Sequence, residues 1–249
     1  MKYKSIFISD VHLGTRFSKA KLLLNFFKHN ECENLILVGD IIDGWSIKRK
    51  LYWPQEHSDV IQKILKKAKK GTKVTFITGN HDEFLRPFVP LLLGNSINIS
   101  NELEYIALNG KKYYITHGDF FDSITMTKKW LAVLGDYGYD LLLHLNSILN
   151  FFRKLFGIRK YWSLSKYVKD NVKSSVSFIN DFESVLANHA RNKAYDGIIC
   201  GHIHKAEIKL IDEIEYLNCG DWVESCTAIV ETFDGKFEII DWLEKNATK

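Results

Sequence analysis

The sequence predicts an α/β fold that is built on a parallel sheet. Three apolar segments rich in β-branched residues, 4–9, 34–38 and 74–78, have the length and composition of buried strands. Amphipathic helical patterns separate them, and this β-α-β-α-β order is typical of parallel strands with covering helices. A long segment of almost wholly helical pattern then interrupts the chain. We therefore expect a core of residues 1–122 and 194–249, with a helical insertion at 123–193.

Local patterns predict the elements of the first half in order. The first strand leads into a helix whose apolar residues span 20–27. The second strand is followed by an aromatic and basic segment, 44–57, which we expect to be a loop. A second helix, 58–70, precedes the third strand, and Gly71 ends it as a C-terminal glycine would.

The second half of the chain returns to strands after an irregular stretch. Two prolines restrict the apolar residues 84–93 to short helical pieces at most. Strands are expected at 112–116 and 196–200, on either side of the insertion. Shorter strands should then continue to the C-terminus, with a turn at Asp234-Gly235.

The composition is that of a folded, soluble protein. The chain of 249 residues is long enough to bury a full core, and 46% of it is hydrophobic against 26% charged. No apolar run reaches the roughly 18 residues of a membrane span, and the N-terminus enters a strand without a secretory signal. The four cysteines form no Cys-x-x-Cys pair. We therefore expect reduced thiols in a cytoplasmic protein rather than disulfides or a zinc ribbon.

Metal-binding side chains follow five of the predicted strands. In open α/β sheets, ligands bind beyond the carboxyl ends of the strands, so these side chains should share one edge. The seven oxygen and nitrogen donors are Asp10, His12, Asp40, Asn80, His117, His202 and His204. One divalent ion does not need seven ligands, whereas two ions that share a carboxylate do. Two ions roughly 3.5–4 Å apart suit in-line displacement at phosphorus, because both the attacking and the leaving oxygen are stabilised.

A turn role is the alternative for each of these residues taken singly. A lone histidine after a strand is more often a hydrogen-bonded turn residue than a ligand, and aspartate and asparagine occur in turns for backbone reasons. Five such groups at five strand ends are hard to obtain from turn chemistry alone. The mixture of imidazole and carboxylate favours manganese, iron or zinc over calcium or magnesium alone. We expect two Mn²⁺ ions, with Fe, Zn or Mg as alternatives.

The motifs that carry these residues resemble those of the calcineurin-like metallophosphoesterases. In chain order they are Asp10-Val11-His12, Gly39-Asp40-Ile41-Ile42-Asp43, Gly79-Asn80-His81-Asp82, His117-Gly118 and Gly201-His202-Ile203-His204. The resemblance spans nearly the whole chain and implies a four-layer αββα sandwich. It also implies that one metal is held by Asp10, His12 and His204 and the other by Asn80, His117 and His202, with Asp40 as the bridge. It further implies that His81, held by Asp82, stabilises the transition state or protonates the leaving oxygen.

Within the family, the chain is most similar to hydrolases of lipid A biosynthesis, which cleave the pyrophosphate bond of a nucleotide-linked diacylated sugar. The insertion fits such a substrate, because it combines an apolar helical stripe, 141–156, with many lysines and arginines. A basic amphipathic helix suits an anionic membrane surface and can also roof a pocket for acyl chains. Plain packing on the core is the alternative for this stripe. The resemblance thus implies a nucleotide-linked lipid substrate and a cytoplasmic enzyme that is peripheral on the inner face of the membrane.

Four basic residues are candidates for contacts with the substrate phosphates or uridine. Lys166, Lys169 and Lys173 recur at helical spacing in the insertion, and Arg49 lies in the aromatic and basic segment after the second strand. Solvated side chains are the alternative for each of them.

Three other functions compete with this one. The hydrolases of lipid A biosynthesis carry arginine where this chain has His81, so another phosphodiester or nucleotide diphosphate stays open as the substrate. A scaffold protein that has lost catalysis should have broken ligand motifs, whereas all seven ligands are present. Nucleic-acid cleavage could use the basic insertion, but the aliphatic stripe argues against it, so no nucleic-acid partner is expected. The sequence does not predict an oligomeric state.

Overall fold

The computed structural model describes residues 1–94, 96–122, 150 and 173–247. The chain divides into two compact units, Met1–Phe120 with Leu186–Lys249, and Phe121–Val185. The larger unit contains both sheets and the candidate site. The insertion predicted at 123–193 overlaps the smaller unit.

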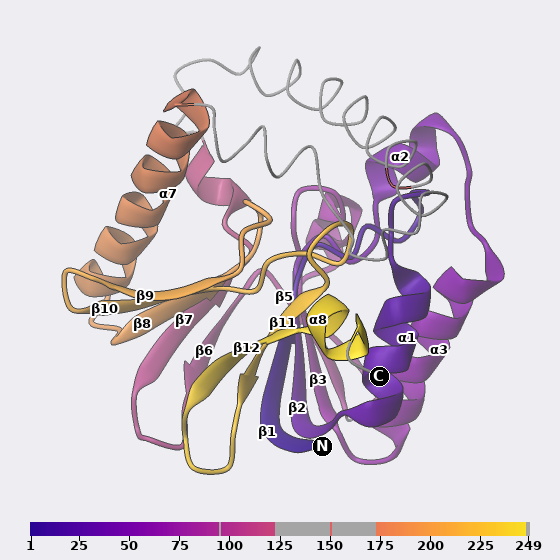
Figure 1. The fold of residues 1–249 in the computed structure, drawn as a ribbon, viewed down its shortest axis with the longest axis horizontal. Helices are drawn as coiled ribbons and strands as arrows, with labels where there is room; N and C mark the ends of the chain where they lie inside the picture. Colours follow the sequence, from indigo (N-terminus) through magenta and orange to yellow (C-terminus); the bar gives the residue numbers. More distant parts are fainter. Residues whose placement is uncertain (95, 123–149, 151–172, 248–249) are drawn as a thin grey trace. The chain divides into compact units, whose positions relative to one another are not determined.

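Seven strands form the first sheet, in the order β12-β11-β1-β2-β3-β5-β4 (Figure 1). Their bounds are β1 Lys2–Ile8, β2 Glu31–Val38, β3 Lys73–Ile77, β4 Leu91–Leu93, β5 Ile97–Ser100, β11 Thr227–Glu231 and β12 Phe237–Asp241. β1, β2, β3 and β5 run parallel, as the β-α-β-α-β pattern predicts. β4, β11 and β12 complete the sheet as antiparallel partners.

Five strands form the second sheet, in the order β6-β7-β8-β10-β9. Their bounds are β6 Glu102–Ile106, β7 Lys112–Thr116, β8 Gly197–Cys200, β9 Glu207–Ile211 and β10 Ile214–Asn218. β7 and β10 both run parallel to β8, and β6 and β9 are antiparallel edges. The carboxyl ends of β7 and β8 therefore lie side by side, although the insertion separates them in the sequence.

Helices cover the outer face of the seven-stranded sheet. α1, Ala20–His29, and α3, Gln55–Lys69, lie together beside its parallel strands (Figure 1). Leu23 and Phe26 of α1 are buried in the same cluster as Val60 and Ile64 of α3. α3 begins three residues before the predicted helix 58–70, directly after Pro54.

The prediction of a loop at 44–57 is wrong at both ends, because α2, Gly44–Arg49, forms in its first part and α3 already begins at Gln55. Asp43 precedes this helix, and its Oδ1 accepts a hydrogen bond from the Ser46 amide at 2.6 Å. An aspartate at this position typically stabilises a helix by about 1 kcal/mol. Capping therefore outweighed the aromatic and basic composition on which the loop was predicted.

Short helices complete the described chain. The irregular stretch after β3 contains η1, Glu83–Phe88, and the chain after β7 contains η2, Asp119–Phe121. The long helix α7 spans Lys173–Asn192, and α8, Trp242–Ala247, follows β12. Within the described residues, no helix has both the length and the apolar character that crossing a bilayer requires.

Alternation along the central strands places apolar side chains on both faces of the seven-stranded sheet. On β1, Ile6 and Ile8 join the cluster under α1 and α3, whereas Phe7 joins a second cluster. This second cluster also contains Tyr113 of β7 and Leu217 of β10, so it is the core between the two sheets. Strands with two buried faces read as continuous apolar runs, which explains the pattern found in the sequence.

The end of α7 covers the other face of the five-stranded sheet. Leu186 and Ala190, which belong to the larger unit, are fully buried, and the His189 ring lies 5.1 Å from that of Tyr114 on β7. The layers of the larger unit are thus helix, sheet, sheet and helix. This arrangement confirms the predicted four-layer αββα fold.

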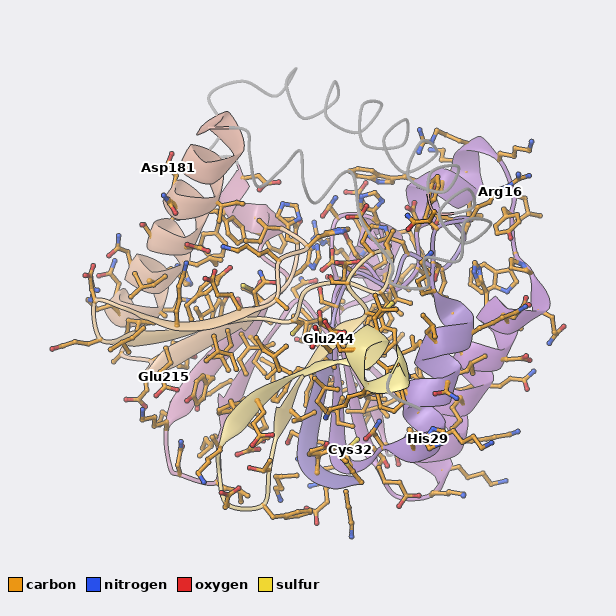
Figure 2. The ribbon with its side chains drawn as sticks, viewed as in Figure 1. Arg16, His29, Cys32, Asp181, Glu215 and Glu244 are labelled. Atoms are coloured by element: carbon orange, nitrogen blue, oxygen red, sulfur yellow. The ribbon has the colours of Figure 1, made fainter. Side chains whose placement is uncertain are left out.

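The predictions for the insertion lie outside the described residues. This applies to the apolar stripe 141–156 and to Lys166 and Lys169, and the side chain of Lys173, the first residue of α7, is not described either. The four cysteines are described, and all are buried free thiols, including Cys32 on β2 (labelled in Figure 2).

The core between the sheets should dominate stability. Phe7 is fully buried, with its ring 5.3 Å from that of Tyr105 and 6.0 Å from that of Phe237. We expect Phe7→Ala to lower the free energy of unfolding by about 3–5 kcal/mol, because it leaves a cavity in this core. Urea unfolding measures the change. Leu65→Ala on α3, where the side chain is 49% exposed, is the control and should stay within about 0.5 kcal/mol; similar losses for both variants would contradict the assignment of this core.

Candidate metal centre

The predicted ligands lie directly after the carboxyl ends of β1, β2, β3, β7 and β8. Backbone hydrogen bonds tie these ends together. The Asp10 amide donates to the Gly39 carbonyl at 3.1 Å, and the His12 amide donates to the Asp40 carbonyl at 2.9 Å. In the other sheet, the Gly201 amide donates to the His117 carbonyl at 3.1 Å. The side chains after β1, β2, β7 and β8 are therefore held by paired backbone.

Five of the seven predicted ligands have left-handed backbone conformations. The φ values are 52° at Asp10, 50° at His12, 54° at Asp40, 70° at His202 and 54° at His204. A positive φ is uncommon outside glycine and costs of order 1 kcal/mol or more. Such strain persists only where surrounding structure imposes it, and it concentrates at functional sites.

The side chains gather in two groups around Asp40. The first group consists of Asp10, His12 and His204, and the second of Asp40, His117 and His202. Within each group the candidate ligand atoms lie within 4.8 Å of one another. In the first, His204 Nε2 is 3.1 Å from Asp10 Oδ1. In the second, His117 Nε2 is 3.1 Å from Asp40 Oδ2, and this same oxygen lies 3.9 Å from His12 Nε2 of the first group.

Each carboxylate has one oxygen engaged by the backbone and one that faces the imidazoles. Asp40 Oδ1 accepts the His81 amide at 2.8 Å, so Oδ2 is left toward His117 and His12. Asp10 Oδ2 accepts the His202 amide at 2.9 Å and the Ser9 hydroxyl, so Oδ1 is left toward His204. The engaged oxygens fix the orientation of the carboxylates, as the surrounding shell of a metal site does.

Several of the inward-facing atoms are buried without a hydrogen-bond partner among the residues that the structure describes. They are Asp10 Oδ1, His12 Nε2, Asn80 Oδ1 and His117 Nε2. A buried polar atom without a partner costs about 1–3 kcal/mol, so a group of them at one place indicates a ligand that satisfies them together. Carboxylate, amide and imidazole donors facing one another fit divalent cations.

His117 also has the tautomer that a metal ligand requires. Its Nδ1 lies 2.9 Å from the Val38 carbonyl, which can only accept, so Nδ1 carries the proton. When the imidazole is neutral, as metal binding requires, the lone pair is therefore on Nε2, which points toward Asp40.

The electrostatics favour a cation at this place. Burial by itself would raise the pKa of the Asp10 and Asp40 carboxyls, but the neighbouring imidazoles outweigh burial and lower both pKa values. Burial would lower the pKa of His117, but the carboxylates of Asp40 and Asp10 raise it to about 10. Protons thus compensate the buried carboxylates. A divalent cation offers the same compensation, and its binding would displace protons from the imidazoles.

Two glycines make room for His117 and Asp40. A Cβ at Gly39, where φ is 80°, would collide with the His117 ring. A Cβ at Gly79 would collide with Asp40 Oδ1 and would lie 2.8 Å from His117 Cδ2. Glycine is therefore required at both positions for the second group of ligands to assemble.

The structure corrects the role predicted for Asp82. Its two carboxylate oxygens accept hydrogen bonds from the amides of Gly79 and Ile41, so Asp82 shapes the turn after β3 and does not hold His81. Burial, and then the Asp40 charge, raise the pKa of Asp82 to about 7. Asp82 is thus a structural residue of this turn rather than a partner of the imidazole.

Asp43 takes the place predicted for Asp82. Its Oδ2 lies 3.1 Å from His81 Nδ1 and 3.2 Å from His12 Nδ1, and the three residues form a further acid–imidazole group. Asp43 was within the quoted motif but was not predicted as a site residue. The three-residue spacing from Asp40 was its only signal in the sequence.

Of the four predicted substrate contacts, the structure describes the side chain of Arg49. Arg49 is exposed at the end of α2, where its Nη2 lies 3.5 Å from Ser46 Oγ. The roles of Arg49 and of Lys166, Lys169 and Lys173 stay predictions.

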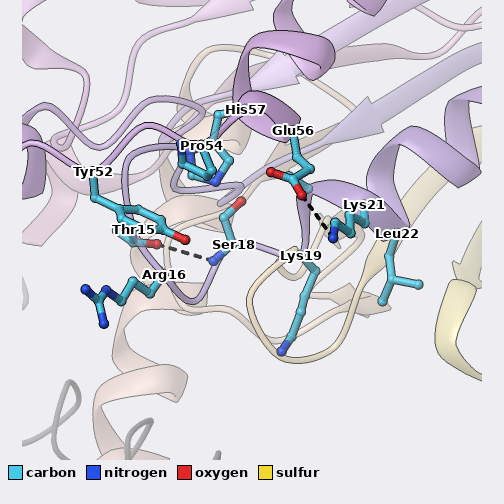
Figure 3. Close-up of a pocket in the computed structure, with 11 residues that line it drawn as sticks. Thr15, Arg16, Ser18, Lys19, Lys21, Leu22, Tyr52, Pro54, Glu56 and His57 are labelled. Carbon is cyan, nitrogen blue, oxygen red and sulfur yellow. Dashed lines mark hydrogen bonds and ion pairs between the residues drawn. The ribbon is translucent and has the colours of Figure 1, made fainter.

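A separate pocket of about 280 Å³ lies between residues 15–22 and residues 52–57 (Figure 3). It is lined by Thr15, Arg16, Ser18, Lys19, Ala20, Lys21, Leu22, Tyr52, Pro54, Glu56 and His57. Lys21 is paired with Glu56 at 2.9 Å, and Arg16 and Lys19 extend in different directions in Figure 3. His57 accepts the Gly14 amide at 3.0 Å, so this region supports the turn after His12. Its charges do not converge as those of the metal centre do.

A known protein family matches the part of the chain that contains this centre. The family model described as calcineurin-like phosphoesterase matches residues 3–206, and the chain belongs to this family. The matched residues include all seven predicted ligands. Together with the clustered carboxylates and imidazoles, this membership makes the protein a metal-dependent phosphoesterase.

The individual proteins that the chain resembles have low sequence identity to it. UDP-2,3-diacylglucosamine hydrolase of Porphyromonas gingivalis is 23% identical, over 98% of this chain and 99% of that protein. The DNA polymerase II small subunit of Methanothermobacter thermautotrophicus is 25% identical, over 53% of this chain and 34% of that protein. Among solved structures, a novel archaeal phosphodiesterase has a TM-score of 0.45 and 14% identity, over 95% of this chain and 98% of that one.

Removal of the carboxylate between the two groups should abolish metal binding. At a Mn²⁺ concentration 100 times the Kd, bound metal should stabilise the wild type by about 2.7 kcal/mol. For a chain of this size that corresponds to a rise in Tm of roughly 5–10 °C over the chelator-treated protein. Asp40→Asn should lose most of this rise, because the amide has no charge to share between cations. Differential scanning calorimetry measures it.

Asp234→Asn is the matched control. Asp234 is an exposed carboxylate paired with Lys236 at 2.8 Å, so its replacement should leave the Mn²⁺-dependent rise intact. A full rise in Tm for Asp40→Asn would show that metal does not bind at this centre.

Proposed function

We propose that the protein hydrolyses the pyrophosphate bond of UDP-2,3-diacylglucosamine and releases UMP and 2,3-diacylglucosamine 1-phosphate, a step of lipid A biosynthesis. The observation that carries the chemistry is the pair of ligand groups around the shared carboxylate of Asp40. The similarity to the P. gingivalis hydrolase over 98% of the chain supports this substrate among those that the family cleaves.

The donor set suits two divalent cations, and we propose Mn²⁺. Asp10, His12 and His204 would hold one, and Asn80, His117 and His202 would hold the other, with Asp40 shared between them. When bound, such ions stabilise negative charge on phosphoryl oxygens and lower the pKa of water. Placement of the substrate diphosphate against this centre would bring the scissile bond next to His81.

The reaction that we propose breaks one bond and forms one. The oxygen of water forms a bond to the α-phosphorus, and the bond from this phosphorus to the bridging oxygen breaks. The bridging oxygen leaves on the β-phosphate, which carries the diacylated sugar. His81 lies beside the ligands, with its ring 4.6 Å from that of His12, and we assign to it the hydrogen bond or proton that the leaving oxygen receives. The carboxylate of Asp43 faces this imidazole, with Oδ2 3.1 Å from His81 Nδ1.

A direct assay tests the reaction. Mn²⁺-loaded protein should release UMP from UDP-2,3-diacylglucosamine, and Asp40→Ala should abolish the release. His81→Ala should lower kcat by about 10²–10⁴-fold, because it removes one acid–base group while the metal ligands stay. Absence of UMP release above the Asp40→Ala background would refute this substrate.

A second substrate class is compatible with the same centre. His81 stands where hydrolases of lipid A biosynthesis have arginine, so another phosphodiester or nucleotide diphosphate is the alternative. High turnover of a soluble diester such as bis(p-nitrophenyl) phosphate, without UMP release from the lipid, would favour it. The metal dependence and the effect of Asp40→Ala should be the same for either substrate.

We also propose that the enzyme works at the inner face of the cytoplasmic membrane. The acyl chains of the substrate are anchored there, and the basic, apolar segment 123–193 is suited to an anionic surface. The protein should float with vesicles that contain phosphatidylglycerol and stay behind with phosphatidylcholine vesicles. Equal recovery with both vesicles, or with neither, would contradict this localisation.

A further inference from the structure

We propose that Trp45 is a positioning residue for His81, through direct contact of the indole with the imidazole. The inference rests on the proposed phosphoester hydrolysis at the metal centre, in which His81 faces the leaving oxygen. Neither the motif that carries His81 nor the metal ligands include Trp45. It enters the site from α2, the helix at the beginning of the segment that the sequence predicted as a loop.

The Asp43 contact does not by itself determine the orientation of the His81 ring. Asp43 Oδ2 is 3.1 Å from His81 Nδ1, but this nitrogen is buried and has no hydrogen bond of acceptable geometry to any described residue. Asp43 Oδ2 is also close to His12 Nδ1, at 3.2 Å, so it is shared between two imidazoles. Packing must therefore contribute to holding the ring.

Two rings supply this packing. The His12 ring meets the His81 ring nearly at right angles, with centroids 4.6 Å apart. The Trp45 ring lies 4.4 Å from it, tilted by 39°. Ring pairs at such distances prefer particular geometries and are worth about 0.5–1.5 kcal/mol beyond their buried area. His12 is a proposed metal ligand, so Trp45 is the neighbouring ring that is available for a positioning role.

Trp45 is itself held in place. Its indole Nε1 donates a hydrogen bond at 2.9 Å to Oε1 of Glu83, a residue that follows His81 by two positions. The amide of Gly44 donates to the carbonyl of His81 at 2.9 Å, so α2 begins on the backbone of the same turn. A Cβ at Gly44 would lie 2.7 Å from Phe84 Cδ1 and 3.0 Å from the His81 carbonyl oxygen. The start of α2 is thus packed closely on the turn 81–84, and Trp45 spans it from Glu83 to the imidazole.

Loss of the indole should therefore affect turnover rather than binding. Trp45 is 38% exposed and belongs to neither core cluster, so its removal should leave the fold intact. The indole contacts His81 and Glu83, and neither is a predicted metal ligand. A His81 ring without this contact would occupy additional rotamers, and the fraction of complexes with the ring toward the leaving oxygen would fall.

The test uses the Mn²⁺-loaded full chain and bis(p-nitrophenyl) phosphate, so it does not depend on the lipid substrate. Trp45→Ala should lower kcat about tenfold with KM within about twofold, as expected when an aligned group is lost. Trp45→Phe should restore most of kcat, because an aromatic face is retained. Mn²⁺ affinity by calorimetry should stay unchanged in both variants.

Phe233→Ala is the control. Phe233 is an exposed aromatic residue whose ring lies 5.9 Å from the Lys2 ammonium, outside the metal centre. Its replacement should leave kcat unchanged. Two variants of the exposed residue Glu83 test the hydrogen bond that holds the indole. Glu83→Leu removes the acceptor and should lower kcat, whereas Glu83→Gln keeps an acceptor and should not. The Glu83 pair also provides the test if Trp45→Ala does not fold.

A double-mutant cycle separates positioning from a general structural effect. In the His81→Ala background, Trp45→Ala should cause no further loss of kcat, because the group through which it acts is gone. An equal loss in both backgrounds, or an unchanged kcat in Trp45→Ala, would overturn the proposal. If the wild type cleaves only the lipid, the same kcat comparisons are made on UMP release. If it cleaves neither bis(p-nitrophenyl) phosphate nor UDP-2,3-diacylglucosamine, the proposed function fails. In that case, crystal structures of the wild type and of Trp45→Ala still test the positioning role, because the His81 ring should be less well ordered in the variant. A His81 ring that is equally well ordered in both structures would overturn the proposal.

Discussion

The buried carboxylate of Asp40 is the constraint on which the site depends. It is 2% exposed, and a buried charge is costly unless opposite charge and hydrogen bonds surround it. One oxygen is satisfied by the His81 amide, and the other faces His117 and His12. The strand ends must therefore converge on this carboxylate, and bound cations would replace the protons that otherwise compensate it.

The fold supplies the rigidity that this convergence requires. The left-handed backbone at Asp10, Asp40 and His202 is unfavourable in isolation, and it is imposed by strands whose side chains are buried on both faces. The core between the sheets holds β1 and β2 against β7 and β8. Because this core joins the two sheets, ligands from each sheet meet at one place.

Chemistry and substrate choice depend on different parts of the chain. The ligand groups and family membership define a metal-dependent phosphoesterase, and these features lie in the larger unit. Asp43 and Trp45 contact His81, and Glu83 holds Trp45; in our proposal these residues govern how the imidazole meets the reacting phosphate. The proposed recognition of the nucleotide and the acyl chains depends on residues of the insertion, so it can vary without change to the metal centre.

The sequence by itself determined the parallel strands and the residues at their ends, because apolar runs and turn residues are local signals. It identified Asp40 and His117 as members of one site, since the carboxyl ends of parallel strands share an edge. Only the tertiary structure decided that Asp43 rather than Asp82 faces His81, that α2 replaces part of a predicted loop, and that Trp45 reaches the imidazole. These contacts join side chains about forty residues apart. Their distances depend on how β2 and β3 are aligned, and no local pattern in the sequence encodes that alignment.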